Sequence, residues 1–198
     1  MKPNDYIHHF TAADDVRLWL TRPARHLDKL YASDGHILIR TYDDADVRVL
    51  DDSPLVSAAE QMLKPLTERN NWISAQMVLP EEWLCCVCGG IGKTITCDRC
   101  EGDGVIEAAT GPHEITCPKC DGMPERGDEN GAPCEHCGGS GAGFQTVPVG
   151  NTWFQRRYLA LLQTLPGPVL LSLNADPKEV AFFTFAHGAG ALMPCRES

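Results

Sequence analysis

Short runs of alternating apolar and polar residues, separated by turn residues, fill the first fifty positions of the chain. Such alternation predicts strands, and one run with helical spacing before Pro23 predicts a helix of about two turns. The order is a strand, a helix and three strands, over residues 6–10, 14–20, 26–33, 36–42 and 45–50. We interpret this segment as a βαβββ unit.

The next stretch has apolar residues at helical spacing over 54–69, where Pro65 is expected to kink or end the helix because proline lacks an N–H donor. A strand is predicted over 72–79. After residue 143 the first order recurs as a strand, a helix capped by Asn151 and three strands, over 144–149, 152–165, 169–173, 180–186 and 189–193. The sequence thus predicts an α+β fold with a duplicated βαβββ unit.

A cysteine-rich stretch, residues 85–143, interrupts this pattern with four Cys-x-x-Cys pairs. Two residues between cysteines allow a tight turn to point both sulfurs at one metal ion about 2.3 Å away, and two such turns complete a tetrahedral site. Eight ligands therefore predict two zinc ions, held by Cys85, Cys88, Cys97, Cys100, Cys117, Cys120, Cys134 and Cys137. Iron is the chemical alternative, since thiolate tetrahedra hold both metals.

Disulfides and redox chemistry are the other interpretations of paired cysteines. A disulfide framework needs an oxidising compartment, and the N-terminus MKPNDYIHHF has no apolar signal-peptide core. A redox Cys-x-x-Cys usually stands alone on a βαβ unit, whereas these four follow one another. Cys86 and Cys195 are left over as ordinary thiols, and His136 is interpreted as a solvated neighbour within a ligand turn.

Glycines follow the cysteine pairs at a fixed spacing. Three pairs continue as Cys-x-x-Cys-x-Gly-x-Gly, while the third has only Gly122 before Met123 and Pro124. Glycine can take the positive φ that wraps backbone N–H groups toward the sulfurs. The repeat resembles the cysteine-rich domain of DnaJ-type chaperones. That resemblance implies a bent β-hairpin in which the first and fourth pairs share one zinc, and the second and third pairs share the other.

This zinc-binding insertion over 85–143 would divide a domain made of residues 1–84 and 144–198. Two βαβββ units side by side resemble one domain of a bacterial DNA sliding clamp. Residues 31–38 (YASDGHIL) are similar to the A-T-D-G-H-R-L turn of that family, and residues 191–196 (ALMPCR) are similar to its V-V-M-P-M-R-L carboxyl end. Ile37 and Cys195 depart from these motifs, as does the terminal Glu-Ser in place of leucine.

The clamp resemblance implies two kinds of contact. In bacterial clamps the matched segments meet in a pocket that grips short peptides of polymerases and repair proteins, and here it would be lined by Ser33, Gly35, His36, Leu38, Leu192, Met193, Pro194 and Arg196. Clamp helices face the DNA, so the expected phosphate contacts are Arg17, Arg22, Arg156 and Arg157. A ring needs six such domains, so this chain would encircle DNA only as a homo-hexamer.

The net charge of the chain limits which classes of partner are expected. The formal net charge of the 198-residue chain is −10, which repels bulk nucleic acid unless the Lys and Arg side chains gather on one face. No apolar run approaches the length that spans a bilayer, so a membrane partner is not expected. Thiolate chemistry favours a reducing cytoplasm, and we expect that of a bacterial or virus-infected bacterial cell.

Three functions follow from these features. The first is a non-enzymatic zinc-binding adaptor, similar to a sliding clamp, that binds a protein partner, with DNA as a further candidate ligand, in replication, repair or their takeover by a virus. The second is chaperone-like peptide binding, although the chain lacks the His-Pro-Asp triplet with which DnaJ-type proteins stimulate their partner ATPase. The third is an acidic inhibitor of a DNA-processing or defence protein.

An enzyme is not expected. The chain has no nucleophile elbow, and GGIGK at residues 89–93 follows a ligand turn without the spacing of a phosphate loop. Four thiolates would also fill the coordination of each zinc, which leaves no open position for a catalytic water.

Overall fold

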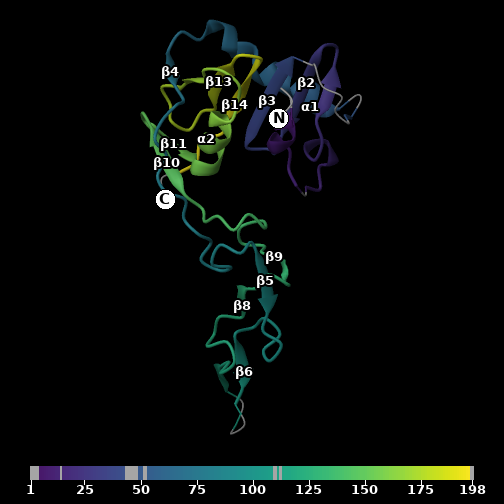
Figure 1. Ribbon diagram of the computed structural model, residues 1–198, viewed down its shortest axis with the longest axis vertical. Coiled ribbons are helices and arrows are strands. Elements are labelled where there is room, and N and C mark those ends of the chain that lie inside the picture. The colour runs from purple at the N-terminus through teal and green to yellow at the C-terminus, as the bar shows by residue number, and fades with distance from the viewer. Residues whose placement is uncertain are drawn as a thin grey trace. The chain divides into compact units, whose positions relative to one another are not determined.

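The computed structural model describes residues 5–13, 15–42, 49–50, 53–108, 111 and 113–196. The chain forms two compact units (Figure 1): Met1–Pro80 with Thr146–Ser198, here called the body, and Glu81–Gln145, here called the arm. The expected domain boundaries, after residue 84 and before residue 144, lie close to these.

A seven-stranded antiparallel sheet forms the centre of the body. Its strands run in the order β1-β2-β3-β14-β13-β12-β4, so strands from both ends of the chain become neighbours. Their bounds are β1 Ala24–His26, β2 Lys29–Ser33, β3 Ile37–Tyr42, β14 Gly188–Leu192, β13 Ala181–Phe185, β12 Leu170–Ser172 and β4 Trp72–Ser74. The expected α+β class, the hairpin of β2 and β3 and the three last strands are confirmed. The strand expected over 26–33 is divided by a turn at Leu27 and Asp28 into the end of β1 and β2, and the strand expected over 72–79 extends only to Ser74.

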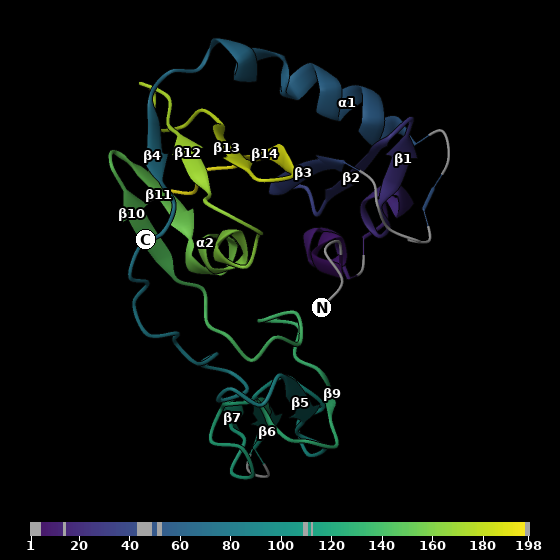
Figure 2. The same cartoon turned by 45° about the horizontal axis from the view of Figure 1, so that its top comes forward.

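Helices cover both faces of this sheet. Helix α1 (Pro54–Met62) belongs to a buried cluster of Leu20, Ala24, Tyr31, Leu38, Leu55, Ala59, Leu63, Phe182 and Ala191. Helix α2 (Arg156–Gln163) belongs to a larger one that includes Leu30, Ile39, Tyr158, Leu159, Leu162, Leu171, Phe183 and Leu192. Successive strand residues such as Phe182 and Phe183 point to opposite faces, so α1 and α2 lie on opposite sides of the sheet (Figure 2).

The helix expected over 54–69 is confirmed, with an interruption before Pro65. Ser53 caps α1, because its hydroxyl accepts a hydrogen bond from the backbone N–H of Leu55 at 3.3 Å. The α-helical part ends at Met62, and the chain continues as the 3₁₀ helix η3 (Lys64–Glu68), which contains the proline.

The expected helix over 152–165 is correct only from Arg156 onward. Residues Thr152–Gln155 form β11 and pair with β10 (Thr146–Val149) in a hairpin. The turn consists of Gly150, with φ +61°, and Asn151, so Asn151 lies in a hairpin turn and caps no helix. Because Gly150 and Asn151 form a two-residue turn, the residues that follow pair with β10 as a strand instead of beginning the helix.

Two expectations for the N-terminal residues are wrong. Residues Asp5–Phe10 form the 3₁₀ helix η1 instead of a strand, which buries Tyr6, Ile7 and Phe10 in the core and leaves the intervening histidines exposed. The expected helix over 14–20 is reduced, in its described part, to the 3₁₀ helix η2 (Leu18–Leu20). Asp15 accepts a hydrogen bond from the backbone N–H of Arg17 at 2.7 Å, and this local turn competes with helix formation.

The strand expected over 45–50 falls largely outside the described residues. At its end, Leu50 makes an isolated parallel bridge to Ala24. Within the described part of the chain, the βαβββ order does not occur twice, and a duplicated clamp domain is not found.

The arm consists of short antiparallel ladders between cysteine turns. Strand β5 (Lys93–Thr96) pairs with β8 (Glu125–Gly127) and with β9 (Ala132–Pro133). Farther along, β6 (Val105–Glu107) pairs with β7 (Glu114–Thr116). These ladders bring turns that are distant in sequence to the same place in the arm.

Candidate metal centre

Site one joins the first and fourth cysteine pairs. The strand-like bridge between Leu84 and Ala142 brings the beginning and end of the arm together, and the ligands Cys85, Cys88, Cys134 and Cys137 follow from it. The Sγ atoms of Cys85 and Cys134 lie 4.0 Å apart, and those of Cys88 and Cys137 lie 3.7 Å apart. A zinc tetrahedron with bonds of about 2.3 Å places its sulfurs about 3.8 Å apart, so the cluster fits one zinc ion.

Site two joins the second and third pairs. Cys97 follows β5, Cys117 follows β7, and the ladders between them set their positions. The Sγ atoms of Cys97 and Cys117 lie 3.9 Å apart, and those of Cys100 and Cys120 lie 3.7 Å apart. All four sulfurs in each site lie within 4.8 Å of one another. The chain therefore has two tetrathiolate sites for two zinc ions, with the pairing that the DnaJ-type resemblance implied.

No disulfide links these cysteines, since all ten are free thiols in the structure. Within the described ranges, no other group of three or more His, Cys, Asp or Glu side chains is arranged to hold a metal ion.

In three of the four Cys-x-x-Cys pairs, the sulfur of the second cysteine accepts a hydrogen bond from a backbone N–H group. Gly92, Gly104 and Gly141 donate to the Sγ atoms of Cys88, Cys100 and Cys137 at 3.2, 3.3 and 3.3 Å, respectively. Each glycine has φ between +72° and +79°. At the equivalent position in the third pair, four residues after Cys120, the chain has Pro124, which has no N–H to donate.

The thiols must lose protons to bind zinc. Burial raises the pKa of the Cys134 thiol to about 11, whereas backbone N–H groups of Cys100 and Arg99 hold the pKa of Cys97 at about 7. In the metal-free site, protons therefore occupy part of the sulfur cluster. Zinc displaces them and makes every ligand a thiolate.

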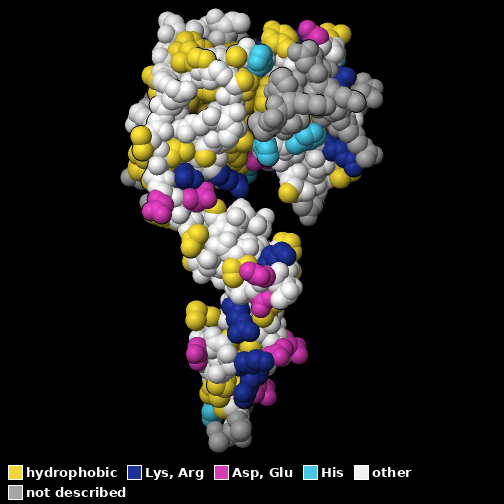
Figure 3. All heavy atoms as spheres, viewed as in Figure 1, with side chains coloured by type: hydrophobic (Ala, Val, Ile, Leu, Met, Phe, Trp, Pro, Cys, Tyr) yellow, Lys and Arg dark blue, Asp and Glu magenta, His cyan; other side chains and the backbone are white. Residues whose placement is uncertain are grey.

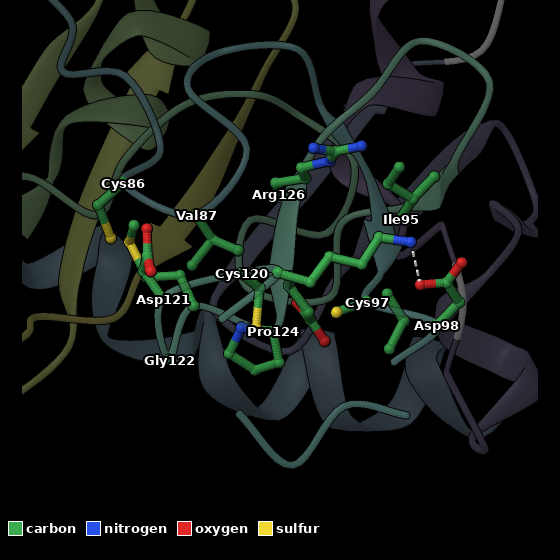
Figure 4. A pocket seen from close by; sticks show the side chains of 14 residues that line it. Cys86, Val87, Ile95, Cys97, Asp98, Cys120, Asp121, Gly122, Pro124 and Arg126 are labelled. Carbon is green, nitrogen blue, oxygen red and sulfur yellow. Dashed lines mark hydrogen bonds and ion pairs between the residues drawn. The ribbon is translucent and has the colours of Figure 1, made fainter. Parts of the chain in front are cut away.

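A groove of about 720 Å³ opens beside site two (Figure 4). Cys97 and Cys120 line it, together with the apolar side chains of Val87, Ile95 and Met123. Lys119 and Asp98, which also line the groove, form an ion pair that joins the third cysteine turn to the second. Spacing in the sequence gave no signal for this groove, because it arises from the way the two turns face each other.

Cys86 and His136, which were not expected to bind metal, contact each other in the structure. Cys86 lies in the first cysteine turn and His136 in the fourth, and both side chains are exposed. Their Sγ and Nε2 atoms lie 3.7 Å apart. The other leftover thiol, Cys195, contacts the backbone oxygen of Trp153 at 3.4 Å, and burial raises its pKa.

The segments of the expected peptide pocket are brought together. The backbone N–H of Met193 donates to the oxygen of His36 at 2.8 Å, next to the ladder between β3 and β14. Leu38, Leu192 and Ser33 are buried, whereas the exposed or half-buried members are Gly35, His36, Met193, Pro194 and Arg196. The peptide pocket itself stays a prediction.

The four arginines expected to contact DNA have different surroundings. Arg17 forms an ion pair with Asp15 at 2.9 Å, and Arg22 is exposed. Arg156 donates to the oxygen of Pro80 at 2.7 Å, and Arg157 stacks 4.6 Å from the ring centroid of the next residue. Figure 3 shows basic and acidic side chains interspersed on the visible face of the arm. Contact with DNA stays a prediction.

No helix in the described ranges combines the length and the apolar character needed to cross a bilayer. Comparisons with protein-family models, with curated proteins and with solved structures each gave no match.

Proposed function

We propose that the protein is a non-enzymatic adaptor that binds a short peptide segment of a protein partner on its body, while zinc holds the arm in shape. The observation that carries this proposal is the hydrogen bond between Met193 and His36, which joins two segments distant in sequence into one surface. These are the segments that resemble the peptide pocket of bacterial sliding clamps.

The chemistry of that surface suits a mixed apolar and acidic peptide. Met193 has 42% of its side chain exposed and offers a flexible apolar contact. His36, whose backbone oxygen accepts from Met193, and Arg196, three residues after Met193, are exposed and offer donors to a carboxylate. Leu38 and Leu192 are buried on opposite faces of the sheet, so they fix the two strands instead of touching a ligand.

The positions of the helices favour peptide binding over a DNA ring. In the clamp interpretation, the helices of both repeats would share one face toward DNA. Here Leu20 of η2, which is the described part of the first expected helix, and α2 pack on opposite faces of one sheet. The proposed adaptor therefore works without encircling a duplex.

The zinc sites support a structural role for the metal. Each site has four thiolate ligands, so neither offers an open position for water or substrate. The ligands come from both ends of the arm, and the metal therefore fixes its ladders.

The test uses a fluorescent peptide of the type that bacterial sliding clamps bind, measured by anisotropy with the full chain. Met193→Asp is expected to weaken binding about tenfold or more, because it places a carboxylate in an apolar contact. Met123→Asp, at an exposed methionine of the arm, is the matched control and should bind as the unchanged protein does. A chain that binds no such peptide, or that loses binding equally with both variants, contradicts the proposal. Light scattering after gel filtration counts the subunits.

A second candidate is chaperone-like binding of unfolded segments by the arm. The groove beside site two favours it, since Val87, Ile95 and Met123 give it an apolar lining. This function predicts that the chain suppresses aggregation of a model substrate and that Met123→Asp, unlike Met193→Asp, abolishes the effect. The two candidates are therefore distinguished by the same pair of variants.

A further inference from the structure

The two zinc sites differ in access. In site one, Cys85, Cys88 and Cys134 are each at most 1% exposed, and Cys137 is partly buried. In site two, Cys97 and Cys120 are only partly buried. Both of them line the groove shown in Figure 4, whereas its lining includes no ligand of site one. A small reagent can therefore reach sulfur in site two from the solvent.

The two zinc sites also differ in the hydrogen bonds that their sulfur atoms accept. An N–H donor draws charge from a zinc-bound thiolate and makes it a weaker nucleophile. The second cysteines of three pairs have a glycine N–H for this purpose, at 3.2 to 3.3 Å. Cys120 has Pro124 at the corresponding position and lacks this donor. The backbone N–H of Gly122 still donates to Cys120 Sγ, so this thiolate is reachable and differs from its equivalents in lacking the N–H four residues further on.

We propose that site two is a modification site, at which hydroperoxides and soft electrophiles attack the thiolate of Cys120 through the groove and release one zinc ion. Site one, in which three of the four ligands are buried and Cys88 and Cys137 each accept a glycine N–H, keeps its metal under the same conditions. The inference rests on the two zinc sites and does not depend on the proposed adaptor function.

The oxidation balances with a hydroperoxide as the oxidant. Cys120 Sγ attacks one peroxide oxygen, the O–O bond breaks, and a sulfenic acid and hydroxide form. Cys100, whose Sγ lies 3.7 Å away, then attacks that sulfur and expels a second hydroxide. The two thiolates supply two electrons and become one disulfide. Zinc retains only two of its four ligands and dissociates.

The experiment follows zinc release from the full chain loaded with two zinc ions, using a chromogenic chelator and hydrogen peroxide or N-ethylmaleimide. Cys86→Ser is the background, because it removes an exposed thiol that is not a ligand. One equivalent of zinc is expected to leave fast and the other slowly. Peptide mapping should find a disulfide between Cys100 and Cys120 after peroxide, and the maleimide adduct first on Cys120.

Pro124→Gly in the same background is the decisive variant. It restores both the N–H donor and the backbone freedom that the other three pairs have. We expect it to slow the fast release by about threefold to tenfold, since lost outer hydrogen bonds change the properties of metal sites on that scale or more. Chelator without oxidant or electrophile should leave both ions bound over the same time.

Each alternative result overturns the inference. These results are equal rates for both ions, modification that begins at a ligand of site one, an unchanged rate in Pro124→Gly, and equally fast loss to chelator alone. The last would mean that site two binds zinc weakly instead of reacting at sulfur.

Discussion

Cys86 Sγ lies 3.7 Å from His136 Nε2, although the two residues are fifty positions apart in the chain. Each occupies an inner position of a Cys-x-x-Cys turn of site one, so the shared metal site brings them together. The contact joins two side chains that are not ligands. Cys86 is therefore a thiol that binds no metal, although its neighbours Cys85 and Cys88 are zinc ligands.

Neighbouring cysteines should therefore differ in their effect on zinc content. Cys86→Ser is expected to retain two zinc ions per chain, while Cys85→Ser, one residue earlier, should lower the content to about one because three thiolates bind the ion less well. Metal analysis after gel filtration gives the stoichiometry. Loss of zinc in Cys86→Ser would show that the ligand set is wrong.

Chelation should affect the two units unequally. The buried cluster of the arm consists largely of the ligands Cys85, Cys88 and Cys134, whereas the body has two extensive apolar clusters. We expect complete removal of zinc, by prolonged incubation with a strong chelator, to abolish amide protection in the arm and to leave the central strands of the body protected. Hydrogen exchange with and without zinc measures both. Simultaneous loss of protection in β3 and β14 would contradict independent stabilisation.

The affinity for zinc should fall as the pH is lowered. Burial raises the pKa of the Cys134 thiol to about 11, so at neutral pH the metal displaces a proton from it. Each displaced proton weakens apparent binding about tenfold per pH unit, since protons and zinc compete for the same sulfur. Competition with a chelator of known affinity between about pH 6 and pH 8 tests this. An affinity independent of pH would mean that the metal-free thiols are already ionised.

A polar contact between β2 and α1 should contribute to the stability of the body. The hydroxyl of buried Tyr31 donates to Glu60 Oε1 at 2.6 Å, and Arg40 lies 3.1 Å from Oε2. Tyr31→Phe is expected to lower the free energy of unfolding by about 1 to 2 kcal/mol, measured with urea. Tyr42→Phe, at a tyrosine that is 62% exposed, should change it little. Equal losses in both variants would exclude a specific role for the buried hydroxyl.

The same contact predicts a dependence on pH. The hydrogen bond from Tyr31, followed by Arg40, lowers the pKa of Glu60 below its ordinary value. Its stabilisation is therefore complete above the unfolded pKa of about 4.3 and disappears as the pH falls through the folded value. Glu60→Gln should flatten this part of the unfolding profile. Because Glu60 is 40% exposed, we expect an effect of at most about 1 kcal/mol.

The zinc ligands were predictable because their signal is local. A Cys-x-x-Cys turn needs only four residues, and its repetition supplies both sites. The groove was not predictable, since it depends on how the turns around Cys97 and Cys120 face each other. The effect of Pro124 was not predictable either. In the other three pairs a glycine at this position donates its N–H to a cysteine sulfur, and only the structure shows those hydrogen bonds.

Apolar periodicity predicted most strands of the sheet and located α1, but it predicted neither the turn that separates β1 from β2 nor the order of the strands. The stretch around Trp153 and Phe154 has helical spacing, yet the preceding Gly-Asn turn folds it into a hairpin. Periodicity also does not determine which face of a sheet a helix covers. The clamp-like duplication was predicted from the order of the elements, whereas the opposite placement of α1 and α2 follows from long-range packing.

The base of the arm is closed by its own hydrogen bonds. Cys85 N–H donates to the oxygen of Gly141 at 2.8 Å, and Gly143 N–H donates to that of Trp83 at 2.7 Å. The two polypeptide segments that enter and leave the insertion are thus tied side by side. For the body, the connection from β4 to β10 then behaves like a short loop whose closure entropy is independent of how many residues lie beyond the tie. The insertion thus leaves and returns at two adjacent positions, and a change in its length beyond the tie would leave the path of the chain from β4 to β10 unaltered.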